Sequence, residues 1–407
     1  MRVLHLIHSF PPETRGGVEA HVEQVARVQM RRGRAVRVLA ASEACPPDGE
    51  LKREDHEGIA VSRFAMETDL QRMTESTGRG LDAVRQALDD EAPDLLHVHH
   101  LAPTGPGVVA LAAERGIPSV VSLHDLFTVC PLFFRLRRDS ELCAAEVPHE
   151  TCVQCLSEET NLPAEAIAPS LLDRDRAMRA DLERAAVLLA QSNGQAQYLR
   201  RVPLLDGLEI ECIGFPAAPE PESGPVGLRL PDLPLRVATW GGLVRGKGLH
   251  TLVAAVRALP PETVELHHFG RVIDEGYAEQ LRAEAGYVPL TFHGAYRPDA
   301  LSEQLADIDL AVFPSLYLET YGLVTDEALR LGLPVIVPDR GAPRERLGAR
   351  GVTYRVGDSA DLATVLDRFV QRPERLLALR AGEPGPFVET EAYVDALDAV
   401  YDGVQRR

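Results

Sequence analysis

Short apolar segments alternate with longer amphipathic ones along almost the whole chain, and this alternation constrains the fold more than any other feature. In the first half we expect strands at 2–8, 35–40, 59–64, 94–98, 118–123, 186–190 and 209–213. Several of these segments are apolar nearly throughout, as in IPSVVSL from Ile117 to Leu123, which a strand buried on both faces requires. The pattern predicts parallel β/α units.

A proline-rich stretch divides the chain. Residues 214–234 contain six prolines and three glycines, a composition typical of a linker. After it the alternation restarts with LRVATW, VELHHF, VPLTF, DLAVFP and LPVIVP. We therefore expect an α/β protein of two doubly wound, Rossmann-like domains at 1–214 and 215–387. The amphipathic segment 388–407 is expected to form a helix that packs back onto the first domain.

The overall charge excludes some classes of partner. The 407 residues carry a formal net charge of −18 at pH 7, whereas nucleic acid and anionic bilayers attract positive protein surfaces. No apolar run approaches the ~18 residues of a membrane span, and Met1–His8 fits a strand rather than a signal peptide. Six cysteines are too few for a disulfide scaffold. We therefore expect a cytoplasmic protein without a transmembrane segment that binds no nucleic acid.

Two glycine-containing turns between a strand and a helix are candidate phosphate sites. Gly16 and Gly17 precede a helix expected from Val18, where free backbone amides and the helix dipole favour an anion. This turn also fits a plain β/α connection, and it lacks the GxGxxG fingerprint of dinucleotide sites. In the second turn, TWGGLVRGKGLHTL, Lys247 adds positive charge at the helix entrance. It is not a Walker loop, because Gly248 stands where Ser or Thr is required.

The most informative segment is FPSLYLETYGLVTDEALRLGLPVIVPD, which includes the end of an apolar strand expected at 309–313. Its loop presents Glu319 and the following helix carries Glu327, with seven residues between the carboxylates. This spacing places Glu327 about one and a half turns inside the helix, so both groups can face a ligand at the carboxyl edge of the sheet. The free amides at the helix start would face a diphosphate.

Four elements of the sequence together resemble the retaining GT-B glycosyltransferases of family 4. They are the Glu319-x7-Glu327 element, the turn GGLVRGKG, the N-terminal RGGVEAHV and the segment SLHDLFTVCP. The resemblance covers nearly the whole chain. It implies two Rossmann-like domains that face each other across a cleft, with the nucleotide-sugar donor bound largely by the C-terminal domain and the acceptor by the N-terminal one.

The resemblance also implies roles for residues of the C-terminal half. Glu327 would bind the ribose hydroxyls of the donor. Glu319 and the backbone amides of Tyr321, Gly322 and Leu323 would hold the transferred sugar and the phosphates.

Further positions complete the implied site. Lys247 would neutralise the diphosphate, and Gly16 and Gly17 would close over it from the other domain. His124 would contact the transferred sugar near the acceptor. The catalytic group would then consist of His124, Lys247 and Glu319.

One position departs from the family pattern. Many relatives have arginine immediately after the first glycine of the lysine-containing turn, where this chain has Gly242. Arg245, three residues later, is the candidate to replace the missing charge and bind the donor, and the alternative is that it is a surface residue.

Positive charge rather than a metal ion is expected to assist departure of the diphosphate. Lys247 and the helix N-termini supply that charge, so catalysis requires no metal cofactor. The DxD strings at 173–175 and 307–309 are like the metal motifs of another transferase architecture. However, the first lies in a predicted helix and the second leads into a predicted strand.

Four cysteines form a separate cluster with the spacing C-x12-C-x8-C-x2-C, namely Cys130, Cys143, Cys152 and Cys155. Four thiolates that end in a CxxC pair fit a structural zinc that fixes the loop beneath the acceptor site. Free buried thiols and disulfides are the alternatives, since only one CxxC pair is present.

Histidines and one tyrosine at strand ends are candidate lining residues. His97, His99 and His100 end a strand, and we interpret them as cleft lining rather than as a metal site because no carboxylate accompanies them. Tyr296 follows another strand end, at the position where similar enzymes hold the nucleobase, and is a candidate to stack on it.

The sequence thus predicts a retaining hexosyltransferase that moves a sugar from a nucleotide-diphosphate sugar to a hydroxyl acceptor, in carbohydrate or natural-product glycosylation. UDP is the first expectation for the donor nucleotide, with GDP as an alternative. A sugar-nucleotide 2-epimerase on the same scaffold and a catalytically silent sugar-nucleotide-binding protein are the other functions considered.

Overall fold

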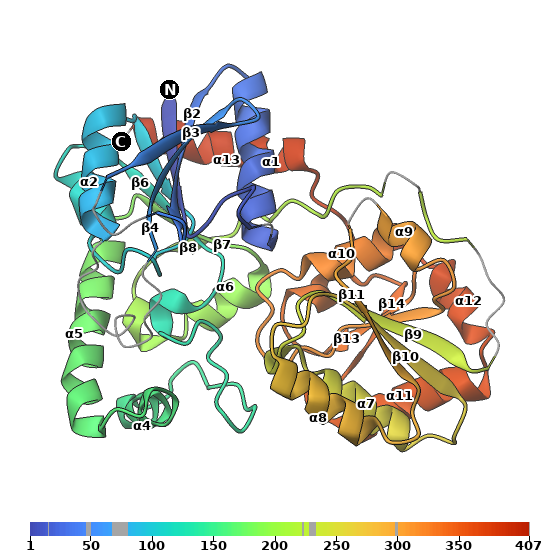
Figure 1. The fold of residues 1–407 in the computed structure, drawn as a ribbon. Helices are drawn as coiled ribbons and strands as arrows, with labels where there is room; N and C mark the ends of the chain where they lie inside the picture. Colours follow the sequence, from blue (N-terminus) through green and yellow to red (C-terminus); the bar gives the residue numbers. More distant parts are fainter. Residues whose placement is uncertain are drawn as a thin grey trace. The chain divides into compact units, whose positions relative to one another are not determined.

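The computed structural model describes residues 1–14, 16–45, 50–66, 80–221, 224–227, 233–297 and 300–406. The chain separates into two compact units, each built around one sheet (Figure 1). The first unit consists of residues 1–138, 143–216 and 388–407, and the second unit consists of residues 139–142 and 217–387.

The sheet of the first unit has eight strands in the order β3-β4-β2-β1-β5-β6-β7-β8. The parallel strands are β1 (Arg2–Ile7), β2 (Ala35–Ser42), β4 (Ile59–Ala65), β5 (Leu95–Val98), β6 (Ser119–Leu123), β7 (Val187–Ala190) and β8 (Ile210–Glu211). These are the seven strands expected from the sequence. Their apolar runs are buried because helices cover both faces of the sheet.

The eighth strand was not predicted. β3 (Lys52–His56) has the sequence KREDH and pairs antiparallel with β4 at the edge of the sheet. A strand of charged residues lacks the apolar pattern that identifies strands, and such residues protect an exposed edge from pairing with another chain. Its register is fixed by pairing with β4 rather than by burial of its own side chains.

The sheet of the second unit has six parallel strands in the order β11-β10-β9-β12-β13-β14. They are β9 (Leu235–Trp240), β10 (Val264–Phe269), β11 (Leu290–Gly294), β12 (Leu310–Val312), β13 (Val335–Pro338) and β14 (Gly351–Tyr354). The first five follow the predicted segments. β14 is a short edge strand that the apolar pattern did not indicate.

Helices cover both sheets. The first unit contains α1 (Gly17–Arg31), α2 (Gly80–Glu91), α3 (Val108–Ala113), α4 (His149–Thr160), α5 (Ala164–Leu182), α6 (Asn193–Leu199) and α13 (Thr390–Gln405). The second contains α7 (Leu249–Arg257), α8 (Glu275–Ala285), α9 (Leu301–Gln304), α10 (Leu323–Arg330), α11 (Ser359–Gln371) and α12 (Arg375–Arg380). The DxD string at 173–175 lies inside α5, and the one at 307–309 directly precedes β12, as expected. None of the described helices combines the length and apolar character needed to cross a membrane.

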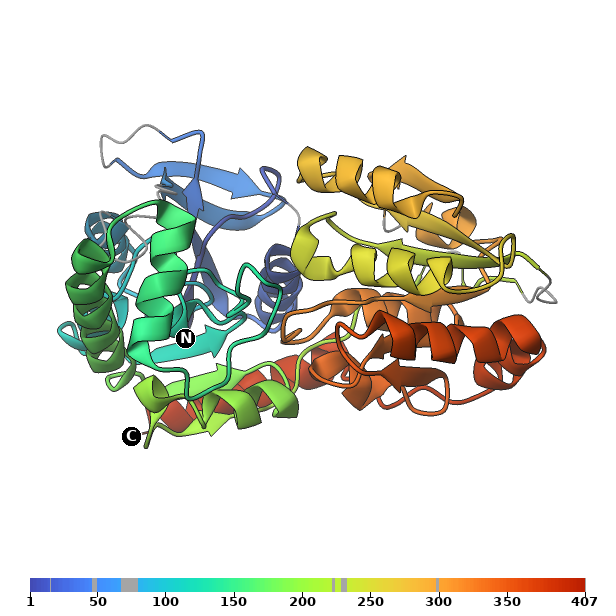
Figure 2. The same ribbon diagram turned by 90° about the horizontal axis from the view of Figure 1, so that it is seen from below.

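The C-terminal helix is part of the first unit, where both views place it (Figures 1 and 2). One face of α13, including Tyr393, Leu397 and Tyr401, is buried in the core beside β1 and α1. Arginines that follow α1 form ion pairs with the acidic face of α13, among them Arg34 Nε with Asp398 Oδ1 at 2.8 Å. Apolar burial and ion pairs therefore both hold this helix on the unit.

Candidate functional site

A lysine and a glutamate meet at the carboxyl edge of the second sheet. Lys247 ends a single 3-10 turn (Arg245–Lys247) between β9 and α7, and Glu319 lies in the loop between β12 and α10. Lys247 Nζ donates to Glu319 Oε1 at 2.7 Å, and Ser315 Oγ donates to the same oxygen at 2.7 Å. The ammonium also lies 5.1 Å from the centre of the Tyr317 ring.

The pair remains charged although it is partly buried. Burial alone would raise the pKa of the Glu319 carboxyl, but the ammonium of Lys247 outweighs burial and holds this pKa below its usual value. Burial alone would likewise lower the pKa of Lys247, and the Glu319 carboxylate instead raises it. The site therefore holds a fixed positive charge beside a fixed negative one at neutral pH.

Gly248 brings the two loops into contact. Its φ of +73° is in the left-handed region, and a Cβ there would lie 2.0 Å from the carbonyl oxygen of Pro314. The amide of Leu316 donates to the carbonyl of Gly246 at 2.9 Å. The glycine that excludes a Walker loop is thus the residue that allows the lysine turn to approach the glutamate loop.

Helix α10 begins beside this pair. Its N-cap is Gly322, at φ +84°, which offers no side chain to the first amides of the helix. Glu327 lies in the second turn, where Oε2 accepts a hydrogen bond from Trp240 Nε1 at 2.6 Å. Burial raises the pKa of the Glu327 carboxyl to about 7, against the opposing effect of that hydrogen bond. Trp240 was missed as a site residue, although the only tryptophan of the chain, at the end of a strand, was a usable indication.

A buried ion pair fixes the loop that contains Tyr321. Arg346 Nε donates to Asp326, which is fully buried, and Arg346 Nη2 donates to the carbonyl of Tyr321 at 2.7 Å. The guanidinium lies 3.8 Å from the centre of the Tyr321 ring. Neither charged residue was predicted, because a charge inside a helix and one far downstream give no local pattern. Together they hold the backbone at the start of α10.

The Lys247–Glu319 pair and the start of α10 line two adjoining hollows. Trp240, Gly242, Lys247 and His268 line one, and Glu319, Gly322 and Arg340 line the other. Phe313, Ser315 and Val324 are common to both. Lys247, Glu319 and Gly322, three of the residues expected to hold phosphates and sugar, therefore line one depression of the second unit, which we call the donor depression after that expectation.

Arg245 and Tyr296, the other two side chains predicted to bind the donor, are not among the described residues that line the donor depression. The Arg245 guanidinium donates to Gln280 and lies 5.2 Å from the centre of the Tyr277 ring, both on α8. Tyr296 packs against the core beneath α10. Burial, and to a lesser extent the nearby Glu327 carboxylate, raises the pKa of the Tyr296 hydroxyl. Tyr296 is therefore near Glu327, whereas the exposed Arg245 contacts side chains of α8.

The predicted residues of the first unit lie at the carboxyl edge of its own sheet. His124 and Asp125 follow β6 and line a hollow with His99 and His100. Asp125 Oδ2 lies 2.6 Å from His100 Nε2. Burial would raise the pKa of Asp125, but His100 outweighs it and lowers that pKa. His97 is not a lining residue: it is fully buried, so the expectation of cleft lining is wrong for this position.

Gly16 and Gly17 are exposed at the start of α1, with Gly16 as the N-cap. The buried Glu19 lies against this turn, since a Cβ at Gly16 would be 2.6 Å from Glu19 Oε2. Glu19 accepts a hydrogen bond from Thr14 at 2.8 Å. A carboxylate already faces the positive end of this helix, which the sequence analysis did not consider.

The four clustered cysteines lie near one another. Burial, and then the thiols of Cys130 and Cys143, raise the pKa of Cys152 to about 11 and that of Cys155 to about 12. All six cysteines lie in the described part of the chain, and none of them is joined in a disulfide there. Among the described residues, three groups have ligand atoms close enough together to bind one metal ion: two groups of histidines and one Glu-His-Glu group. The cysteine sulfurs do not form such a group. The structural zinc stays a prediction.

Comparison with known proteins gives consistent matches over both units. The family described as "Glycosyl transferase 4-like domain" matches residues 16–213, and the family "Glycosyl transferases group 1" matches residues 234–372. The D-inositol 3-phosphate glycosyltransferase of Stackebrandtia nassauensis is 28% identical over 427 residues, which cover 96% of this chain and 88% of that protein.

Solved structures match over the whole chain. Sucrose-phosphate synthase from Thermosynechococcus elongatus has a TM-score of 0.64 at 17% identity, covering 100% of this chain and 97% of that one. Anabaena HepE in complex with UDP-glucose has a TM-score of 0.61 at 16% identity, covering 100% of both chains. These likenesses show that the fold is GT-B, the two-domain Rossmann-like architecture expected from the sequence.

Proposed function

Because the chain belongs to the group 1 glycosyltransferases, and so transfers a sugar from a nucleotide sugar, we propose that it is a retaining hexosyltransferase that acts on a hydroxyl acceptor without a metal ion. One observation carries this proposal. The Lys247–Glu319 pair and the uncapped start of α10 line the donor depression, and Glu327 is bonded to Trp240 of the same lining.

In this proposal the diphosphate lies between the ammonium of Lys247 and the amides of Tyr321, Gly322 and Leu323, which supply fixed positive potential. Glu319, held by Lys247 and Ser315, orients the transferred sugar. Glu327 uses the oxygen that Trp240 does not bind to accept hydrogen bonds from the ribose. Each group is positioned before the donor binds, so little reorganisation is needed as charge develops on the phosphate.

The transfer step makes and breaks one bond at the anomeric carbon. The bond to the diphosphate oxygen breaks, and the acceptor oxygen bonds to the same face of the carbon, so the configuration is retained. The proton of the acceptor hydroxyl passes to the departing phosphate oxygen. Positive charge near that oxygen lowers the barrier, which is the part we assign to Lys247.

For the nucleotide we propose UDP, with GDP as the alternative. The solved complex of Anabaena HepE with UDP-glucose supports this choice. We place the base near Tyr296, because Tyr296 neighbours Glu327, the proposed ribose ligand.

The test combines binding with product analysis. Thermal shifts with UDP-, GDP-, ADP- and TDP-sugars identify the donor, since a ligand at 100 times its Kd stabilises the folded state by about 2.7 kcal/mol. With that donor, the anomeric configuration of the product is read by NMR in the presence and absence of EDTA. An inverted product, or activity that EDTA abolishes and that Mg²⁺ or Mn²⁺ but not Zn²⁺ restores, contradicts the proposal. A donor epimerised at C2 without transfer identifies the epimerase, and binding without turnover identifies the silent binding protein.

We also propose that Cys130, Cys143, Cys152 and Cys155 hold a structural zinc. Protein purified under reducing conditions without chelator should contain about one zinc per chain. Cys152→Ser should lose the metal, whereas Cys212→Ser, outside the cluster, should retain it. Metal-free wild-type protein would show that the four thiols are only packed together.

A further inference from the structure

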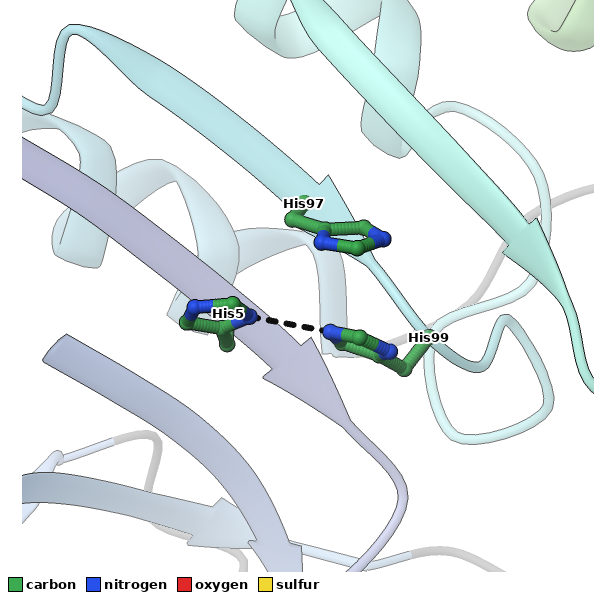
Figure 3. A group of neighbouring side chains, drawn as sticks. All are labelled: His5, His97 and His99. Carbon is green, nitrogen blue, oxygen red and sulfur yellow. Dashed lines mark hydrogen bonds between the residues drawn. The ribbon is translucent and has the colours of Figure 1, made fainter. Parts of the chain in front are cut away.

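Five histidines gather in the interior of the first unit. His5 lies on β1, His97 on β5 and His99 just after it, and Figure 3 shows these three rings facing one another. His124 follows β6, and His21 lies on α1. All five side chains are buried. His5 and His21 could not be identified from the sequence, because a single histidine within an apolar strand or helix forms no recognisable pattern.

Three of these histidines form a continuous hydrogen-bonded chain that begins at Gln29. Gln29 Oε1 lies 2.9 Å from His5 Nε2, and His5 Nδ1 lies 2.9 Å from His99 Nε2 (Figure 3). His99 Nδ1 lies 2.9 Å from His124 Nε2. We call Gln29, His5, His99 and His124 the histidine chain. It connects a buried glutamine of α1 to His124, the residue for which the family resemblance implies a contact with the transferred sugar.

Burial keeps the rings of the chain neutral. It lowers the pKa of His5 to about 4 and holds the pKa of both His99 and His124 well below its usual value. A neutral imidazole donates through one ring nitrogen and accepts through the other. In a chain of such rings, the tautomer at one end therefore determines the tautomer at the other.

The direction of the chain follows from its first member. The amide oxygen of Gln29 can only accept, so His5 donates from Nε2 and accepts at Nδ1. His99 must then donate from Nε2 and accept at Nδ1. His124 must in turn donate from Nε2, which leaves Nδ1 as its accepting nitrogen.

We propose that Gln29, acting through His5 and His99, fixes the tautomer of His124, so that Nε2 donates into the interior and Nδ1 accepts. The consequence for the reaction rests on the function proposed above for the whole protein. With this tautomer, His124 presents an acceptor rather than a donor to a ligand hydroxyl at the hollow that it lines, and has no proton to give to a leaving group. Gln29, His5 and His99 are positioning residues for this contact.

A metal ion is the other occupant that buried histidines suggest. Ligand nitrogens of His5, His97 and His99 lie within 4.8 Å of one another, as do those of His21, His99 and His124. His99, which is common to both groups, already uses both ring nitrogens in the histidine chain. An ion at either place would break at least one of these hydrogen bonds, so the observed pairing favours the tautomer role.

Side-chain ¹⁵N NMR of histidine-labelled protein tests the proposal directly, because it distinguishes protonated from unprotonated ring nitrogens. With the His124 signals assigned from a His124→Asn variant, we expect the wild type to be protonated at Nε2 and unprotonated at Nδ1. Protonation at Nδ1, or displacement of the His99 and His124 signals by one equivalent of Zn²⁺, would overturn the proposal. This readout does not depend on activity, so it is decided even if the proposed function fails.

Variants then test the origin of the tautomer. Gln29→Met keeps the buried volume but removes the accepting oxygen, and should populate the second tautomer of His124. Ser122→Ala is the matched control, because Ser122 bonds His97 at 2.9 Å, outside the histidine chain. In a transferase assay, Gln29→Met should lower kcat about tenfold, the rate equivalent of one ordinary hydrogen bond, with the donor KM nearly unchanged. A His124 spectrum that is unchanged by Gln29→Met, or changed equally by Ser122→Ala, would contradict the assignment.

Discussion

One buried polar group in each unit is held in a different way. In the second unit, charges lie in pairs, Lys247 with Glu319 and Asp326 with Arg346. In the first unit, the histidine chain joins neutral rings end to end. Removing one member of an ion pair leaves a charge without compensation, whereas removing a neutral partner leaves only an unmade hydrogen bond. The ion pairs of the second unit should therefore be more sensitive to single substitutions than the neutral hydrogen bonds of the histidines.

The largest effect is expected at the buried pair beneath Tyr321. Arg346→Met keeps an unbranched side chain but leaves Asp326 buried without its guanidinium, which should lower the free energy of unfolding by about 3–5 kcal/mol. Ser122→Ala, which removes a neutral buried partner of His97, should cost only about 1–3 kcal/mol. Urea denaturation of both variants measures the comparison.

Equal losses in the two variants would show that the kind of buried partner does not matter. The double variant Asp326→Asn with Arg346→Met serves as a control, because it removes the charge along with its partner. It should recover part of the loss seen in Arg346→Met alone.

The second effect is on turnover. Lys247→Ala should lower kcat by about 10²–10³, the usual loss for a group that stabilises developing charge in the transition state. The donor KM should change less, because the interaction strengthens as the phosphate departs. Lys247→Arg keeps the charge and should retain part of the rate. If Lys247→Ala raised KM without lowering kcat, the lysine would serve ground-state binding only.

Strand positions and the charged loop residues of the second unit were predictable because each leaves a local pattern. Apolar runs marked twelve of the strands, and a glutamate after such a run, followed by Tyr-Gly and a helix, marked Glu319 and Glu327. β3 escaped because its residues are charged and its place depends on pairing with β4.

Partners that are distant in sequence could not be predicted. Trp240 is 87 residues from Glu327, and Gln29 is 24 residues from His5. The first pair meets because β9 lies beside β12, the strand before α10, and the second because α1 packs on β1. No local pattern specifies either contact. The sequence therefore indicated the residues that the proposed function uses but not the partners that orient them.

A smaller effect is expected at Glu327. Glu327→Ala should weaken donor binding by about 1–3 kcal/mol, the range for a lost hydrogen bond to a charged group, as measured by calorimetry. Because burial raises the pKa of this carboxyl to about 7, donor affinity of the wild type should rise as pH increases through 7 and the carboxylate forms. Glu327→Gln should remove this pH dependence. Donor affinity that is unchanged in Glu327→Ala would contradict the ribose role.

The same titration affects stability in the opposite direction. The folded state holds this proton more tightly than the unfolded state, whose glutamate has a pKa of 4.5. The resulting stabilisation is complete below pH 4.5 and is lost as pH rises through 7. Without donor, the Tm of Glu327→Gln relative to wild type should therefore increase between pH 6 and pH 8.

The smallest effect concerns the cation that Gly242 lacks. Arg245 is exposed and contacts Gln280 and Tyr277 on α8, so Arg245→Ala should change kcat and KM by no more than about twofold, which corresponds to a few tenths of a kcal/mol.

Arg340 instead lines the donor depression with Glu319. If a second cation acts on the diphosphate, Arg340→Ala should lower kcat about tenfold, since a guanidinium can bind phosphate through two parallel hydrogen bonds. Steady-state kinetics of the two single variants, measured alongside Lys247→Ala, show which arginine, if either, acts on the diphosphate. A tenfold loss in Arg245→Ala with none in Arg340→Ala would mean that Arg245 leaves α8 when the donor binds. Two unaffected variants would mean that the diphosphate departs with Lys247 and the start of α10 as its only positive groups.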